Sequence, residues 1–194
     1  MRSKQRMEEF VFDLLNNQLP DYCFYHNLEH TQYVMEKAIE IGQQEHCSQT
    51  ETDLLTTAAL WHDTGHIHKY AGHEEESCLL ARQYLPQFGY DESEIELVCG
   101  MIMATKTPQT PLNRLEEIVA DADLEYLGTD SVAEKSNLLF REIQALDPAM
   151  TRNDWLNTQI SFIQKHHYFT PFCITHKQPM KAVYLDRLEH MLDK

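Results

Sequence analysis

The segment TETDLLTTAALWH, residues 50–62, is an unusually apolar stretch in a chain that is otherwise rich in charge. Its apolar residues recur at helical spacing, and they are Leu54, Leu55, Ala58, Ala59 and Trp61. A helix with this much apolar surface is enclosed by other elements and does not lie on the outside of a domain. We therefore expect residues 50–62 to form a central helix around which the rest of the chain packs.

Helical spacing of apolar residues continues on both sides of this segment. The predicted helices are one that ends at Leu19-Pro20, and then about 27–44, 50–62, 72–85, 91–105, 112–128, 131–146, 151–166 and 179–192. Polar loops at 63–72 and 105–111 interrupt the pattern. No alternating run is long enough to predict a sheet, and 6 Gly and 7 Pro leave little material for the turns of a sandwich or barrel. The predicted fold is an all-α, single-domain helical bundle.

The formal charge of −15 argues against a nucleic-acid polymer or an anionic membrane as partner, since the sequence contains no dense Lys/Arg cluster. The first residues, MRSKQRMEEFVFDLL, predict neither a signal peptide nor a membrane span. Five scattered cysteines without C-x-x-C spacing favour reduced thiols over disulfides or a zinc site. We expect a cytoplasmic protein, and the oligomeric state stays open.

Two histidines lie four positions apart in FYHNLEHTQYV, residues 24–34. His26 and His30 would project from one face of a helix that started at or before His26. His62 and Asp63 are adjacent at the end of the central helix. Ionisable groups at the edge of a buried helix are costly unless they are paired, hydrogen-bonded or bound to metal.

The segment IVADADLEYLG, residues 118–128, adds two carboxylates in an apolar context, at Asp121 and Asp123. Each of these elements alone is weak evidence, because histidine pairs and His-Asp pairs are common on surfaces. Together, three apolar segments deliver nitrogen and oxygen ligands, a mixture that suits Mn, Fe, Zn, Ni or Mg and does not select among them.

The order His, then His-Asp, then Asp on three separate helices resembles the HD-domain superfamily of metal-dependent phosphohydrolases. The residues that carry the pattern are His30, His62, Asp63 and Asp123, within a matching region from about 20 to 145. The resemblance implies one HD-type domain over residues 1–194, an all-helical bundle with a divalent metal ion (Mn, Fe, Ni, Zn, Co or Mg) in its core, and a small phosphorylated substrate.

Two shorter motifs refine the resemblance. YHNLEH, residues 25–30, is similar to the Y-H-N-x-x-H signature of cyclic-nucleotide phosphodiesterases, and HDTGH, residues 62–66, to their H-D-x-x-H. By this resemblance His26 is the proton donor to the leaving oxygen, Asp63 serves both metal and catalysis, and His66 lies in a second shell or binds a second metal.

The stretch AGHEEES, residues 71–77, resembles the H-E-x-x-[GS] element that some HD proteins use for a second metal. This assigns His73 and its neighbour Glu74 to that place. The histidine expected about one helix later is missing, which favours one tight metal. The resemblance selects Asp123 as ligand and leaves Asp121 as a second-shell or second-metal residue, although the DAD sequence offers both carboxylates.

Lys69, Lys106 and Arg114 lie in or beside the loops that flank the motifs, and they are candidates for binding phosphate oxygens or are solvated loop charges. In KHHYFT, residues 165–170, the residues His166, His167 and Tyr168 either pack near the site or mark the end of a helix.

The main functional hypothesis is a hydrolase that cleaves a phosphoester of a nucleotide or another small metabolite. Its alternatives are an HD-type di-iron oxygenase and a non-catalytic binding module that the metal stabilises.

Overall fold

The computed structural model describes residues 3–192, and these residues form helices and loops without a strand. The α-helices are α1 (Lys4–Gln18), α2 (Leu28–Gln44), α3 (Gln49–Trp61), α4 (His73–Tyr84), α5 (Glu92–Ala104), α6 (Arg114–Asp123), α7 (Val132–Leu146), α8 (Arg152–Lys165), α9 (Pro171–His176) and α10 (Gln178–Leu192). Short 3-10 helices lie at Thr64–Ile67, Leu85–Phe88 and Glu125–Gly128. The prediction of an all-α fold is confirmed.

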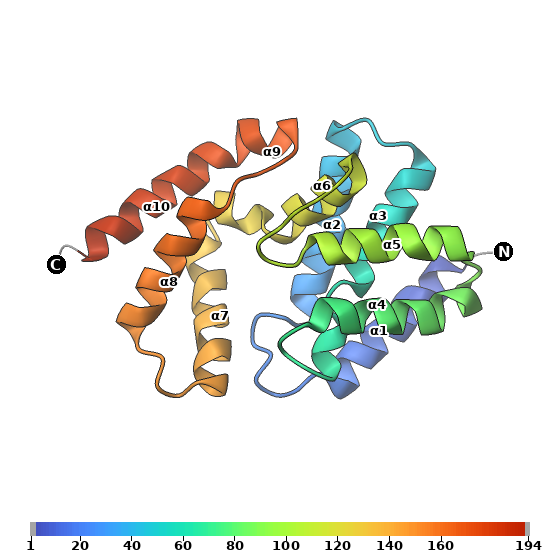
Figure 1. Ribbon diagram of the computed structural model, residues 1–194, viewed down its shortest axis with the longest axis horizontal. Coiled ribbons are helices and arrows are strands. Elements are labelled where there is room, and N and C mark those ends of the chain that lie inside the picture. The colour runs from blue at the N-terminus through green and yellow to red at the C-terminus, as the bar shows by residue number, and fades with distance from the viewer. Residues whose placement is uncertain (1–2, 193–194) are drawn as a thin grey trace.

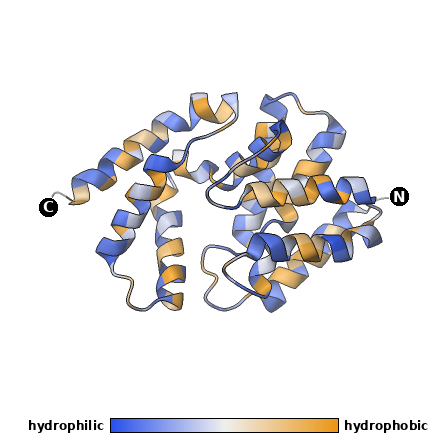
Figure 2. Cartoon of the chain, in the orientation of Figure 1, coloured by the Kyte–Doolittle hydropathy of each residue, from blue (hydrophilic) through white to orange (hydrophobic). Residues whose placement is uncertain are grey.

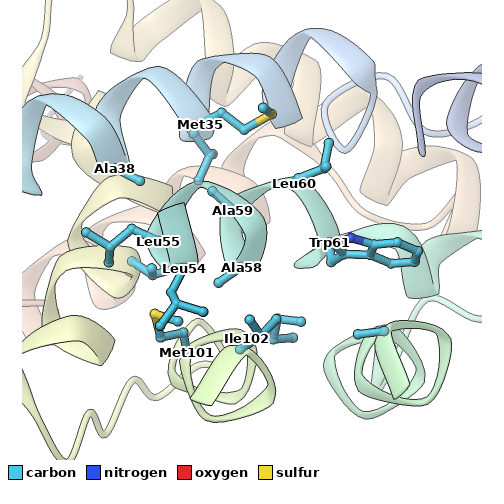
Figure 3. Packing of buried hydrophobic residues seen from close by; sticks show 14 of the residues in the cluster. Met35, Ala38, Leu54, Leu55, Ala58, Ala59, Leu60, Trp61, Met101 and Ile102 are labelled. Atoms are coloured by element: carbon cyan, nitrogen blue, oxygen red, sulfur yellow. The ribbon is translucent and has the colours of Figure 1, made fainter. Parts of the chain in front are cut away.

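Helix α3 is central, as its composition predicted. Leu55, Ala58 and Trp61 have no exposed surface, and the helix contacts α2, α5 and α6. Figure 3 shows its side chains between Met35 of α2 on one side and Met101 of α5 on the other. Burial of large apolar side chains such as Leu55 and Met101 is the main favourable contribution to folding, at about 1.5–3 kcal/mol for each side chain.

A second hydrophobic cluster lies on the C-terminal side of the molecule. Helices α7, α8 and α10 lie together at the opposite side of the ribbon from α1, α4 and α5 (Figure 1). Their buried residues, with the segment after α6, form this cluster around Leu127, Ile160 and Tyr184. Because α6 buries Ile118 in the first cluster while the chain just after it joins the second, the C-terminal end of α6 lies where the two clusters meet.

Most helix ends lie within one or two residues of the predicted ones, and three differences from the prediction are notable. The helix predicted over 112–128 ends at Asp123, where Leu124 leaves the helical conformation (φ −104°, ψ 12°) and a 3-10 turn follows. The predicted helix from Asn27 begins one residue later, because Asn27 is its N-cap. The short helix α9 was not predicted. Thr170 is its N-cap and Pro171 its first residue, but a helix of six residues is too short to show a periodic pattern of apolar residues.

Figure 2 shows hydrophobic and hydrophilic residues on every helix, as expected for amphipathic helices around shared clusters. Within residues 3–192, none of the helices combines the length and the apolar character that crossing a bilayer requires.

The turn after α3 is fixed by α4. Ser77 donates from Oγ to the His62 carbonyl (2.6 Å) and accepts from the Gly65 backbone N–H (2.8 Å). At Gly65 a Cβ atom would overlap the backbone carbonyl of His73, so only glycine allows α4 to lie this close.

We predict that Gly65→Ala lowers the free energy of unfolding by about 1–3 kcal/mol, because the backbone of α4 has to move away. Gly100→Ala is the matched control, since its Cβ would meet only the flexible carboxylate of Glu116 at 3.0 Å. Urea denaturation of both variants measures the difference. Equal stability of the two variants would contradict the close-packing argument.

Candidate metal centre

Four side chains converge where the two hydrophobic clusters meet. His30 Nε2 lies 3.4 Å from Asp63 Oδ2 and 3.2 Å from Asp123 Oδ1. His62 Nε2 lies 3.1 Å from the same oxygen of Asp63 and 3.4 Å from His30 Nε2. The two imidazoles and two carboxylates that the sequence predicted as ligands therefore lie together in one buried site.

Each of these residues lies at the end of a helix. Asn27 caps α2 by accepting the His30 N–H (3.1 Å), which places His30 in the first turn. His62 is the C-cap of α3, and its Nδ1 donates to the Ala59 carbonyl (2.7 Å). That bond fixes the tautomer and leaves the lone pair on Nε2 to face the two carboxylates. Asp123 is the last residue of α6.

The charges of this site call for a cation. Burial alone would lower the pKa of His62, but Asp63 and Asp123 raise it well above its ordinary value. Burial alone would raise the pKa of Asp63, but His62 lowers it. Asp63 Oδ2 is buried and has no hydrogen-bond partner. A buried unsatisfied oxygen next to two imidazole nitrogens fits a divalent ion, and the donor atoms of His30, His62 and Asp63 lie within 4.8 Å of one another.

A second group of histidines faces the other oxygen of Asp63. His73 Nε2 lies 3.4 Å from Asp63 Oδ1 and 3.7 Å from Glu74, while His66 Nε2 lies 4.0 Å from Asp63 Oδ1. The His66 ring stacks on the rings of His73 and His26, with centroids 3.8 and 4.4 Å apart. Burial lowers the pKa of His66 to about 2, so its ring is neutral, and neither of its nitrogens has a partner. His26, Asp63 and His66 could hold a second ion.

His26 does not share a helix with His30, because α2 begins at Leu28. Its ring nevertheless lies close, at a centroid distance of 5.8 Å from the His30 ring. The orientation of His26 comes from Glu142 of α7, which accepts from His26 Nδ1 and from the backbone N–H groups of Tyr25 (2.9 Å) and His26 (3.1 Å). Burial opposes a charged imidazole, but the hydrogen bond to Glu142 and the negative charges of Asp63 and Glu142 together outweigh burial and raise the pKa of His26.

Sequence reasoning missed Glu142, which has no exposed surface. Its only signal is a carboxylate between Phe140 and Ile143 on a predicted helix, and a helix of this length normally carries such charges on its outer face. Its partner lies 116 positions earlier in the chain, so no local pattern connects the two residues.

Asp121 does not join the centre. Its carboxylate accepts from the backbone N–H groups of Phe169 (3.0 Å) and Thr170 (2.8 Å) and from the Thr170 hydroxyl (2.7 Å). Residues two positions apart on a helix project from nearly opposite sides, so Asp121 points toward the start of α9 while Asp123 points into the centre. The structure therefore does not place Asp121 in the second shell or at a second metal, as the sequence had suggested.

Of the three candidate cations, only Lys106 lines the cavity at the centre, where it also pairs with Glu75. Lys69 lies 3.4 Å from Glu76. Arg114 does not line this cavity: its guanidinium donates to Glu51 (2.6 Å) and to the Glu45 carbonyl (3.1 Å) and so joins α6 to the junction of α2 and α3.

The segment after α8, residues 166–168, was predicted either to pack near the site or to mark the end of a helix, and the structure shows packing for Tyr168. The Tyr168 hydroxyl is buried and donates to the carbonyls of Leu124 (3.1 Å) and Glu125 (3.2 Å). His166 caps the C-terminus of α8, and the exposed His167 makes a ring contact with Phe169.

A cavity of about 530 Å³ extends from the centre into the C-terminal helices. One wall carries His26, Asp63, His66, His73 and Asp123. The other wall is uncharged and largely apolar, and it includes Leu139, Ile143, Trp155, Gln159 and Phe162. Cavities of this size and character bind small organic molecules.

Comparison with known proteins supports the pattern of the centre. The protein-family model for the HD domain matches residues 27–125, a span that contains all four converging residues. No curated protein sequence matches the chain. Among solved structures, the chain resembles a predicted HD superfamily hydrolase from an uncultured Thermotogales bacterium, with a TM-score of 0.63, 21% identity, and coverage of 100% of this chain and 98% of the other.

We predict that Asp123→Asn and Asp121→Asn have opposite signatures. Asp123→Asn should lose bound metal, because a neutral amide replaces an anionic ligand. Asp121→Asn should keep the metal and lose about 1–3 kcal/mol of stability, because it weakens three hydrogen bonds to a buried carboxylate. Elemental analysis and thermal unfolding of the two variants test this. Metal loss in Asp121→Asn alone would reverse the assignment.

Proposed function

The chain belongs to the HD domain family, and on this premise we propose that it is a metal-dependent phosphohydrolase. Its substrate is a nucleotide or another small phosphorylated metabolite, and the bond cleaved is a phosphoester. The single observation that carries the proposal is the combination of a buried His/Asp centre with a separate imidazole, His26, at the same cavity.

The residues that would hold the ion are His30, His62, Asp63 and Asp123. When bound, a divalent ion provides Lewis acidity, lowers the pKa of coordinated water and compensates the charge of the phosphate. Without such a cation, an acidic site in a protein of net charge −15 would repel a phosphate group. Lys106, on the wall of the cavity, adds a positive charge beside the phosphate.

His26 is placed to act as the general acid. Hydrolysis breaks the bond between phosphorus and the leaving oxygen, and a proton has to reach that oxygen. Because Nδ1 of His26 donates to Glu142, Nε2 is the ring nitrogen that can give its proton to the leaving group. Glu142 is a positioning residue in this scheme, since it acts on the substrate only through His26.

The uncharged wall of the cavity favours a substrate whose organic part is neutral and partly apolar. Trp155 donates from Nε1 to Ser136 Oγ (3.4 Å), and Tyr184 donates to Gln159 Oε1 (3.2 Å). These polar atoms lie among apolar side chains of the C-terminal helices. A nucleoside has this mixture of a planar body and a few hydrogen-bonding atoms.

The second candidate, an HD-type di-iron oxygenase, has one observation in its favour, which is the position of His66 and His73 beside the second oxygen of Asp63. Two irons per chain together with oxygen uptake would select it. The uncharged wall of the cavity and the His26–Glu142 pair favour the phosphohydrolase.

The decisive experiment is metal analysis of the purified protein, followed by a screen of phosphomonoesters and phosphodiesters with Mn, Fe, Ni, Zn, Co and Mg. We expect hydrolysis that a chelator abolishes and that the restored metal returns. Metal-loaded protein without activity on any phosphoester would reject the proposal. If removal of the metal also unfolds that inactive protein, the non-catalytic module is the better description.

We predict that His26→Ala lowers kcat by about 10²- to 10⁴-fold, because a general acid is lost. The variant should keep its fold and the ion at His30, His62, Asp63 and Asp123. Circular dichroism and elemental analysis provide the controls. Unchanged kcat in His26→Ala would remove His26 from the mechanism.

A further variant, Glu142→Gln, tests the positioning role through pH. The carboxylate raises the pKa of His26, so the neutral amide should lower it. A general acid works while it is protonated, and the decline of kcat with rising pH should therefore begin at a lower pH in the variant. A uniformly reduced kcat with an unshifted pH profile would indicate a purely structural role for Glu142.

A further inference from the structure

A second cavity, of about 620 Å³, lies beside the metal-side cavity and has no part in the proposed reaction. It is formed by the 107–109 loop, Leu124, the C-terminal half of α8 and the segment to Phe169. The two cavities share the walls Thr107, Leu124, Thr158 and Phe162. No residue of the metal centre lines the second cavity.

The charge of this cavity is opposite to that of the protein. Lys165, His166 and His167 line it, together with amide and hydroxyl groups such as those of Asn157 and Ser161. No Asp or Glu is among the described residues that line it, although the chain has 31 of them. Lys165 and His167 are exposed, so the ammonium charge of Lys165 and the imidazole donor of His167 are available to a ligand.

His166 offers a fixed hydrogen-bond donor at this place. The Lys181 ammonium is buried and donates to His166 Nδ1 (2.9 Å) and also to the His166 carbonyl. An ammonium group has no acceptor, so Nδ1 must carry the lone pair and the proton of the neutral ring is on Nε2. Burial lowers the pKa of His166 to about 3, which keeps the ring neutral. His166 Nε2 is buried and has no partner.

Gln109 offers a fixed acceptor. Its Nε2 donates to the Ala120 carbonyl (2.8 Å), and this bond sets the orientation of the amide. Its Oε1 is buried and has no partner. One wall residue thus has an unsatisfied donor and another has an unsatisfied acceptor, and such buried groups are rare unless a ligand or water completes them.

From this geometry we propose that the cavity between the 107–109 loop and α8 is a second ligand site, and that it takes a phosphorylated molecule of nucleotide size. Its phosphate lies against Lys165 and His167. Its uncharged ring lies between Phe162 and Phe169, beside His166 and Gln109, whose unsatisfied Nε2 and Oε1 become available to it after a small shift of these side chains. The volume of 620 Å³ exceeds what a phosphate ion alone fills, and it lies in the range of small-molecule sites.

The test is calorimetric titration of the metal-loaded, full-length protein with inorganic phosphate and with the nucleoside 5′-monophosphates of the common bases. Lys165→Ala/His167→Ala should weaken binding of a nucleoside monophosphate by roughly tenfold or more, through loss of charge-assisted hydrogen bonds. Lys4→Ala/His190→Ala is the matched control, because it removes the same two residue types at exposed positions that do not line the cavity.

A second pair of variants tests the cavity by its volume. Ser161→Trp places an indole in this cavity alone, and it should abolish the same binding. Asn153→Trp, an exposed position on the first turn of α8, should leave it unchanged. Binding that responds in this way to both pairs supports the site.

Three results would overturn the proposal: no nucleoside monophosphate binds at millimolar concentration, only inorganic phosphate binds, or Lys165→Ala/His167→Ala and Ser161→Trp bind as their controls do. Because Ser161, Lys165 and His167 line this cavity and not the metal-side one, the comparison of each variant with its control assigns the binding to this cavity even when nucleotides also bind at the metal centre.

Discussion

Asp63 and Asp123 pack against the same two imidazoles away from bulk water, and the helices around them have to compensate this removal of charge from water. Carboxylates taken out of water are costly unless opposite charge and hydrogen bonds compensate them. Here His30 and His62 compensate in part, and the unsatisfied oxygen of Asp63 leaves a place for a cation. The site lies where two hydrophobic clusters meet, and Asp63 and Asp123 also line the cavity of about 530 Å³. The binding site exists only in the folded state, so a cation that binds there would stabilise the folded state by its binding free energy.

The helices that bring these residues together are held at their ends. Asn27 caps α2 at His30, the Ala59 carbonyl orients His62, and Ser77 of α4 holds the turn that follows. Backbone groups at helix ends lack partners within the helix, so side chains that satisfy them also fix where the next residues lie. The same principle explains Asp121, whose carboxylate satisfies the backbone at the start of α9 and thereby ties the C-terminal segment to α6.

Local patterns were sufficient for the central helix, and they singled out His30, His62, Asp63 and the two carboxylates of the DAD segment, whereas the choice of Asp123 over Asp121 came from the family resemblance. His30, His62 and Asp63 each adjoin a strongly apolar helix, and Asp123 follows Ile118 and Val119 at helical spacing. Long-range partners could not be predicted in this way. Glu142 is buried through contact with a residue 116 positions earlier, and Arg114, placed near the motifs by its loop, binds Glu51 instead. The break of the predicted 112–128 helix at Asp123 arises because the next residues join another cluster and Glu125 binds Tyr33 and Lys177, which no spacing reveals.

The family motif and the C-terminal helices therefore determine different properties of this protein. The motif residues on α2, after α3 and on α6 would hold the metal ion of the proposed reaction, and they lie within the region shared with the HD domain family. Glu142, the uncharged wall of the cavity and the basic segment 165–167 all lie beyond residue 125. In the proposed reaction the phosphate group is common to all substrates, so the remaining part of the substrate would be recognised by those later residues. A chain with the same motif but a different C-terminal part would keep the chemistry and change the molecule on which it acts.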